Sequence, residues 1–301
     1  MYVKKIKGTG TKKILIIAGI HGNESNAVNL LSKISRKYEI NYTDIGQVTF
    51  LNAINTTGLK YNTREFQEES KESKESNDLN RYFDDEVKED KIQIMEELSQ
   101  YIKEHDLIID IHNSPNVVIP SVVIALNEHA PFYIRKCVKL NIPYILYSNT
   151  NTVKKYADWT LGKEAYTIEV NQMGYNILND FEVDCPYDQS SNYNALKAMI
   201  DKLTKSTTFD KKEYEDFSHL EPYKCILLTS YHEGLYEWNT DCFGRLVKEG
   251  TVLANIVDPI DRKKISSIRA PRHGYIMTIS PSYWASVGSC AGDFQPVVNI
   301  S

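Results

Sequence analysis

Apolar runs and amphipathic stretches alternate along the first two thirds of the chain. The segment KKILIIA at 12–18 becomes continuously apolar after its lysines, which is typical of a strand buried on both faces. The stretch 25–38 has leucines and isoleucines at helical spacing and predicts a helix with one buried face. Further strands are predicted at 47–54, 107–111, 122–126, 144–147 and 165–170, and further helices at 85–104, 131–140 and 192–203. Strands interleaved with helices predict an α/β sheet covered on both faces.

The pattern breaks in two places. Between residues 56 and 77 it gives way to a polar tract, EESKESKES, which predicts a surface loop at 67–77 that is either a lid or a solvated insertion. After residue 205 a polar linker is predicted, followed by short apolar runs separated by glycine and proline, which are typical of a small all-β domain. We therefore expect a catalytic domain over 1–205 and a C-terminal β domain over 206–301.

Composition narrows the function classes. The 301 residues carry a formal charge of −5, and lysine-rich pieces are interspersed with acidic residues, so we expect no nucleic-acid partner. The first residues have no apolar signal segment and the run at 14–20 is too short to span a bilayer, which predicts a cytoplasmic protein with no membrane partner. The five cysteines are scattered without a CxxC pair, so neither a disulfide framework nor a thiolate zinc site is expected.

Two candidate metal-binding segments each follow an apolar strand. HGNE at 21–24 places His21 and Glu24 three residues apart at the start of a predicted helix, where both side chains can reach one cation. DLIIDIH at 106–112 ends with His112, and Asp110 lies on the same face because it is two residues away in a strand. Two histidines and one carboxylate form a recognised catalytic zinc site with a fourth position for water. Structural or solvated histidines are the alternative for either segment alone.

Two further segments carry charged groups with candidate catalytic roles. Glu169 lies inside the apolar strand YTIEV, where an ionised carboxylate is unfavourable unless it is paired, for example with Lys163, or accepts a proton from water. Arg81 follows Asn80 in DLNRYF, and Arg64 lies upstream in YNTREF; such groups bind a substrate carboxylate or stabilise an oxyanion. Surface ion pairs are the alternative for each arginine.

Taken together and in this order, HGNE, an arginine, DLNR, DxH after a strand, and IEV resemble the succinylglutamate desuccinylase/aspartoacylase family of the zinc carboxypeptidase-like superfamily. The resemblance covers roughly residues 10 to 205, and APRHGYI at 270–276 is similar to that family's C-terminal domain. It implies a mixed eight-stranded sheet flanked by helices, one Zn²⁺ per chain, and hydrolysis of the amide bond of a carboxylate-bearing N-acyl amino acid.

The resemblance also implies residue roles. His21, Glu24 and His112 match the zinc ligands, Glu169 the general base, and Arg64 the arginine that polarises the scissile carbonyl. Asn80 and Arg81 match the pair that grips the substrate carboxylate. Two further substrate contacts are predicted at Asn113, next to His112, and at Tyr283 in the C-terminal domain. Asp110 or Asp78 is expected to orient a ligand histidine, and the sequence does not choose between them.

The sequence departs from the family pattern at two places, and several alternative functions and metals are left open. Family members selective for acyl-aspartate carry an arginine about ten residues before the general base, whereas 154–161 contains Lys154, Lys155 and Trp159 but no arginine, which allows a neutral or aromatic substrate side chain. The family's NP dipeptide reads Asn55–Thr56, which affects a loop. A metallocarboxypeptidase acting on small peptides is the nearest alternative function, and a non-catalytic binding module a more distant one. Iron or manganese in place of zinc, and a homo-oligomer, are left open.

Overall fold

The structure is a computed structural model, and it describes residues 1–66, 78–82, 92–125, 129–147, 153–171, 189–205, 225–280 and 284–296. The predicted surface loop at 67–77 and Tyr283 lie outside this part of the chain. Contacts divide the chain into two compact units. The first comprises Met1–Ser114, Asn149–Glu169 and Ala195–Thr207, and the second comprises Pro115–Ser148, Val170–Asn194 and Thr208–Ser301. The predicted division near residue 205 stays a prediction, because residues 206–224 are not among those described.

A mixed seven-stranded sheet has the order β1-β3-β2-β4-β7-β5-β6. Its strands are β1 (Tyr2–Lys7), β2 (Lys12–Ala18), β3 (Ile45–Asn52), β4 (Leu107–Ser114), β5 (Ser121–Ala125), β6 (Tyr144–Tyr147) and β7 (Glu164–Asn171). β2 pairs in parallel with both β3 and β4, while β1 adds to β3 in the antiparallel direction. The α/β class is thus confirmed, with seven strands among the described residues where the family resemblance implied eight.

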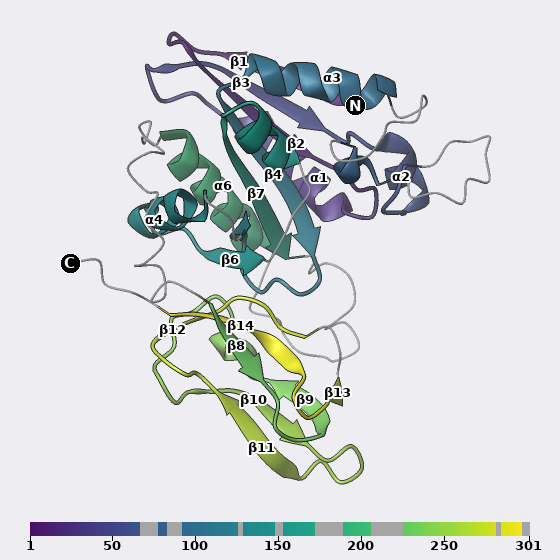
Figure 1. The fold of residues 1–301 in the computed structure, drawn as a ribbon, viewed down its shortest axis with the longest axis vertical. Coiled ribbons are helices and arrows are strands. Elements are labelled where there is room, and N and C mark those ends of the chain that lie inside the picture. Colours follow the sequence, from purple (N-terminus) through teal and green to yellow (C-terminus); the bar gives the residue numbers. More distant parts are fainter. Residues whose placement is uncertain are drawn as a thin grey trace. The chain divides into compact units, whose positions relative to one another are not determined.

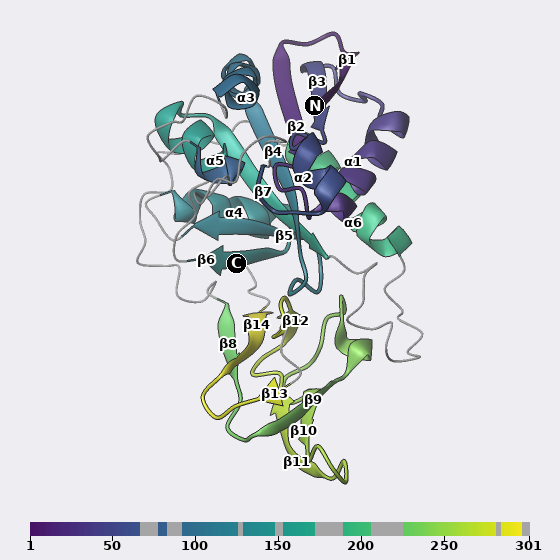
Figure 2. The same ribbon diagram turned by 90° about the vertical axis from the view of Figure 1, so that its right-hand side faces the viewer.

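Helices cover both faces of the sheet in the first unit. Leu15 and Ile17 of β2 pack with Leu98 and Ile102 of α3 (Ile92–Glu104) in one buried cluster. Because side chains alternate along a strand, Ile14 and Ile16 face the opposite side, where α1 (Ser25–Lys37) packs. Figure 2 shows α1 and α3 on opposite sides of these strands. Continuous burial of 14–18 explains why this strand is apolar without alternation.

Of the remaining helices, α4 (Ala130–Leu140) and α6 (Gln189–Lys205) are the longer ones and the others are short helices and turns (Figure 1). These are α2 (Thr56–Tyr61), the 3-10 turn η1 (Leu79–Arg81), α5 (Val153–Lys155) and the π-helical turn η3 (Tyr156–Thr160). The prediction that regular structure stops at residue 56 was wrong for α2, because Asn55 caps this short helix by accepting from the Gly58 N–H at 2.8 Å. No helix among the described residues is long and apolar enough to cross a membrane.

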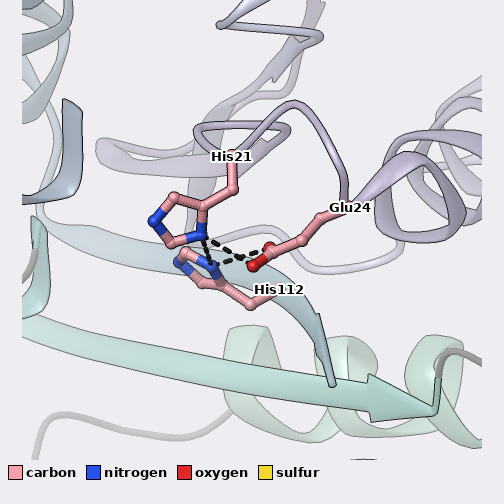
Figure 3. A group of neighbouring side chains, drawn as sticks. All are labelled: His21, Glu24 and His112. Carbon is pink, nitrogen blue, oxygen red and sulfur yellow. Dashed lines mark hydrogen bonds and ion pairs between the residues drawn. The ribbon is translucent and has the colours of Figure 1, made fainter. Parts of the chain in front are cut away.

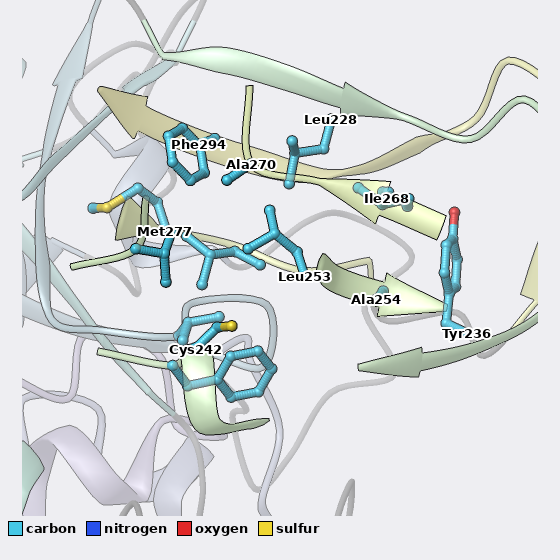
Figure 4. Close-up of a cluster of buried hydrophobic side chains, with 14 of the residues drawn as sticks. Leu228, Tyr236, Cys242, Leu253, Ala254, Ile268, Ala270, Met277 and Phe294 are labelled. Carbon is cyan, nitrogen blue, oxygen red and sulfur yellow. The ribbon is translucent and has the colours of Figure 1, made fainter. Parts of the chain in front are cut away.

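The second unit contains the predicted C-terminal β structure. Its two small sheets have the orders β11-β10-β9-β13 and β12-β14-β8. The strands are β8 (Ile226–Thr229), β9 (Gly234–Trp238), β10 (Val252–Val257), β11 (Lys264–Arg269), β12 (Gly274–Ile276), β13 (Trp284–Ala285) and β14 (Cys290–Pro296), with the 3-10 turn η6 (Thr240–Cys242) between β9 and β10. Leu253, Met277 and Phe294 lie in the core between these strands (Figure 4). The four described cysteines are free thiols.

Candidate metal centre

Two neighbouring parallel strands bring the predicted metal ligands to one edge of the sheet. β2 ends at Ala18, and the loop that follows carries His21 and Glu24 before α1 begins at Ser25. β4 carries His112 near its carboxyl end. Since Ala18 pairs with Ile111, the residues after β2 and the end of β4 meet at the same place. This geometry follows from parallel pairing, because the carboxyl ends of parallel strands share one edge.

The side chains of His21, Glu24 and His112 converge and are buried (Figure 3). His21 Nδ1 lies 2.7 Å from Glu24 Oε1, and His112 Nδ1 lies 2.9 Å from Glu24 Oε2. The two Nδ1 atoms are 3.1 Å apart. One ligand atom of each residue therefore lies within 4.8 Å of the other two, close enough for all three to bind one ion.

The outer nitrogen of each ring is held by a different aspartate. Asp78 Oδ1 lies 3.1 Å from His21 Nε2, and Asp110 Oδ2 lies 2.9 Å from His112 Nε2. Burial raises the pKa of Asp78, but hydrogen bonding and the charges of His21 and Arg64 outweigh burial and bring that pKa well below its ordinary value. An ionised carboxylate only accepts, so the Nε2–H of His21 donates to Asp78 and its Nδ1 is left to face the site.

The donor set fits a cation. With protons on both Nε2 atoms, the two Nδ1 lone pairs and the Glu24 oxygens are all acceptors, and acceptors at these distances repel one another unless a positive charge lies among them. Burial raises the pKa of Glu24, but His112 and His21 outweigh it and hold that pKa well below normal. Burial lowers the pKa of His112, yet Asp110 and Glu24 outweigh it and raise that pKa well above normal. The site therefore attracts a proton or a metal ion, and imidazoles with a carboxylate suit zinc.

Glu169 on β7 interacts electrostatically with the histidines and Glu24 of this centre. Its Oε2 atom is buried and has no hydrogen-bond partner among the described residues. Burial raises the pKa of Glu169 to about 7, with His112 opposing and Glu24 reinforcing the shift. Lys163, considered as its ion-pair partner from sequence, donates instead to the main-chain carbonyls of Lys103 and His105. A carboxylate with a pKa near neutrality is suited to accept and return a proton.

Arg64 pairs with two carboxylates of the centre. Its Nε and Nη2 atoms each lie 3.2 Å from Asp78 Oδ2, and its Nη1 lies 3.6 Å from Glu24 Oε1. The arginine side chain is 44% exposed, whereas Asp78 and Glu24 are buried. The guanidinium group thus reaches the centre from its solvent side.

The predicted substrate-binding residues Asn80, Arg81 and Asn113 lie in two different segments near the centre. Asn80 is buried at η1, next to Asp78, and its Oδ1 accepts from the Val153 N–H at 3.1 Å. Arg81 follows it in the same turn. Asn113 supports the His21–Glu24 loop, called the metal loop below. Its Oδ1 accepts from the Ala27 N–H at 3.1 Å, and its main-chain N–H donates to Glu24 at 3.3 Å. Substrate contact by these residues stays a prediction.

A close approach between two glycines supports the His21–Glu24 loop and was not predicted. A Cβ at Gly22 would lie 2.0 Å from the carbonyl carbon of Gly58 in α2, and a Cβ at Gly58 would meet the Asn55 side chain. The Gly22 N–H also donates to the Arg64 carbonyl at 3.3 Å. The glycine within HGNE is the only sequence signal for this contact, because its partner is 36 residues away.

Comparison with known proteins supports the family resemblance. The sequence profile of the succinylglutamate desuccinylase/aspartoacylase catalytic domain matches residues 10–185. No curated protein matched the chain.

Solved structures share the fold at low identity. An aspartoacylase family protein from Mesorhizobium loti is 16% identical, with a TM-score of 0.62 over 99% of this chain and 89% of that one. The product-bound ectoine utilisation protein EutE (DoeB) from Ruegeria pomeroyi is 18% identical, with a TM-score of 0.58 over 98% and 88%. A succinylglutamate desuccinylase from Silicibacter sp. TM1040 is 18% identical, with a TM-score of 0.59 over 98% and 88%. At these identities the likeness shows the fold.

Proposed function

This chain belongs to the succinylglutamate desuccinylase/aspartoacylase family, and from that premise we propose that it is a zinc-dependent deacylase that hydrolyses the amide bond of an N-acyl amino acid. One observation carries the proposal beyond family membership. The acceptor atoms His21 Nδ1, His112 Nδ1 and one Glu24 oxygen converge, and that donor set suits a divalent metal ion. We assign zinc to these three residues, one ion per chain.

A bound zinc ion supplies Lewis acidity, which makes a water molecule acidic near neutral pH. Glu169 accepts the proton from this water, for which its buried carboxylate and its pKa of about 7 are suited. The water oxygen attacks the amide carbonyl carbon and forms the new C–O bond. The C–N bond then breaks as Glu169 returns the proton to the leaving amine nitrogen. The proton therefore ends on the amine product and Glu169 is regenerated.

Arg64 stabilises the negative charge that develops on the carbonyl oxygen. Its guanidinium lies at the solvent side of the centre, where a substrate carbonyl would enter, and is anchored by Asp78. Asn80 and Arg81 bind the substrate carboxylate from the adjacent turn η1, which holds the amide for attack and removes much of the entropic barrier. The partner of the chain is thus a small molecule that bears a carboxylate.

The residues before Glu169 suggest which kind of amino-acid side chain the substrate carries. At 153–160 the chain forms α5 and η3, in which the Lys155 ammonium lies 5.4 Å from the centre of the Trp159 ring. A lysine over an indole ring is a weaker carboxylate anchor than an arginine fork. We therefore propose a neutral or aromatic side chain rather than aspartate.

The test is hydrolysis across a panel of N-acetyl and N-succinyl amino acids, with matched tripeptides, in zinc-loaded and chelator-treated protein. We expect turnover of acylated amino acids that is lost on chelation and restored by zinc. Preference for tripeptides would establish the carboxypeptidase alternative, and chelator-insensitive turnover would contradict the metal assignment.

A further inference from the structure

A single carboxylate, that of Asp78, contacts three of the groups to which the proposed function assigns roles. Its Oδ1 atom lies 3.1 Å from His21 Nε2 and accepts from the Asn80 N–H at 2.9 Å. Its Oδ2 atom accepts from Arg64 Nε at 3.2 Å and forms an ion pair with Arg64 Nη2 at the same distance. Asp78 is also the N-terminal cap of η1, so the turn that carries Asn80 and Arg81 begins on the same side chain.

The contact through Oδ1 fixes the state of His21. Because the ionised carboxylate accepts at Nε2, the imidazole carries its proton there and directs its Nδ1 lone pair toward Glu24 and His112. Without this acceptor the ring could carry its proton on Nδ1 instead. A proton on Nδ1 would occupy the position of a metal bond.

The contact through Oδ2 fixes the position of Arg64. The Nε hydrogen bond and the Nη2 ion pair to the same oxygen set the plane of the guanidinium and leave Nη1 as the group nearest Glu24, at 3.6 Å. Much of the arginine is exposed, and a flexible side chain in solvent would otherwise occupy many rotamers. Asp78 therefore restricts the cationic group that the proposed mechanism needs beside the carbonyl oxygen.

Asp110 provides a contrast within the same centre. It contacts the other ligand histidine through Oδ2, at 2.9 Å from His112 Nε2, while its Oδ1 has no hydrogen-bond partner among the described residues. The two aspartates thus hold equivalent positions on the two imidazoles. Only Asp78 joins its histidine to the arginine.

We propose that Asp78 is a positioning residue that couples the metal site to the oxyanion site, orienting His21 with one oxygen and Arg64 with the other. This inference rests on the proposed roles of those two residues. It predicts that Asp78 affects zinc affinity and the catalytic contribution of Arg64 together, whereas Asp110 affects zinc affinity alone.

The variants Asp78→Asn and Asp110→Asn make the same chemical change at both positions. An amide has one acceptor oxygen, so Asn at 78 satisfies either His21 or Arg64, while Asn at 110 can still accept from His112. Each variant is combined with Arg64→Lys, which keeps the charge but loses the fork. Zinc affinity is measured by competition with a chromophoric chelator, and turnover is measured at saturating zinc.

We expect Asp78→Asn to weaken zinc binding about ten- to a hundredfold. Arg64→Lys should lower turnover strongly in the wild-type and Asp110→Asn proteins but only within about twofold when Asp78 is already asparagine. An equal effect of Arg64→Lys in all three proteins would overturn the proposal. If Asp78→Asn does not fold, as judged by circular dichroism, Asp78→Glu takes its place, because it keeps both oxygens but moves them by one methylene group.

Nitrogen-15 spectra of the imidazoles in metal-free protein provide a readout independent of activity. The Nε2–H form of His21 should dominate in the wild type and lose population in Asp78→Asn, and an unchanged tautomer would contradict the proposal. A wild-type protein that binds no zinc in the chelator titration would remove the proposed function, while these spectra would still report on Asp78.

Discussion

The Nδ1 atoms of His21 and His112 face each other at 3.1 Å, while the Nε2 atom of each ring lies against its own aspartate. This arrangement leaves two nitrogen lone pairs and the Glu24 carboxylate around a common point. A positive charge at that point is required for the three groups to stay together.

Zinc should stabilise the folded chain and release protons as it binds. Stabilisation of about 2.7 kcal/mol is expected at free zinc a hundredfold above Kd, seen as a higher melting temperature. Because Asp110 and Glu24 outweigh burial and raise the pKa of His112, zinc must displace a proton, and its apparent affinity should increase with pH. Calorimetry in buffers of different ionisation enthalpy measures the released protons. Zinc binding without proton release would contradict this account of the metal-free centre.

Glu169→Gln should keep zinc and lose turnover. The amide preserves the shape of the side chain but cannot accept a proton, so kcat should fall by about 10²- to 10⁴-fold. Zinc content by atomic absorption is the control for an intact site. Near-normal turnover in a zinc-loaded variant would remove Glu169 as the base.

Arg81→Ala should mainly weaken binding of substrates with a free carboxylate. Loss of a charged hydrogen-bond partner is expected to raise KM by an amount equivalent to about 1.5–3 kcal/mol. The matched comparison is the same acyl amino acid with its carboxylate amidated, for which the variant and the wild type should behave alike. Equal losses on both substrates would show that Arg81 does not bind the carboxylate.

Gly22→Ala should disturb the metal loop. The added Cβ would lie 2.0 Å from the Gly58 carbonyl carbon and 2.3 Å from its Cα, so the backbone must move, at about 1–3 kcal/mol. Zinc affinity should fall along with stability. Gly162→Ala is the control, because its Cβ meets nothing within 4 Å and only its φ of +64° is unfavourable. The control should lose stability in urea unfolding while its zinc affinity is retained.

Buried His105 should make the folded chain less stable below neutral pH. Its Nδ1 donates to the Tyr101 carbonyl at 2.6 Å and its Nε2 accepts from the Thr49 hydroxyl at 2.8 Å, so the ring is neutral. Burial lowers its pKa, and the unfolded chain therefore binds a proton at higher pH than the folded chain.

The stabilisation by His105 is complete above the unfolded pKa of about 6.5 and is lost as pH falls toward the lower folded pKa. Over that window the free energy of unfolding should decline by up to about 1.4 kcal/mol per pH unit. Urea unfolding between pH 8 and 5 measures it, and His105→Gln should lack this component. Identical pH dependence in the two proteins would show that His105 does not contribute.

The sequence predicts those parts of the fold and centre whose signals are local. A strand buried on both faces must be continuously apolar, so β2 and β4 could be predicted, and each leads directly to a residue of the candidate metal centre. β1 was missed because YVKKIK lies exposed at the edge of the sheet and carries lysines that do not suggest a strand. Helix α2 was missed because it has only six residues, TTGLKY, which are too few to show a helical pattern of apolar side chains. Asn55 caps its first turn.

The pairing of Asp78 with His21 and of Asp110 with His112 could not be chosen from sequence. Asp110 is two residues from His112, which favours contact, but the partner of His21 depends on how a segment 57 residues away folds back. The same holds for Arg64, whose pairs with Asp78 and Glu24 also join residues far apart in the sequence. Long-range side-chain geometry is set by tertiary packing, which spacing alone does not encode.

The exposed edge strand β1 also bears on whether two copies of this protein can pair through their sheets. It closes one end of the seven-stranded sheet, and its outer backbone groups could pair with a strand from another molecule. Lys4, Lys5 and Lys7 place three like charges along this short border, so two such borders repel each other on approach. The lysines that conceal this strand from sequence-based prediction thereby disfavour edge-to-edge pairing of two copies through β1.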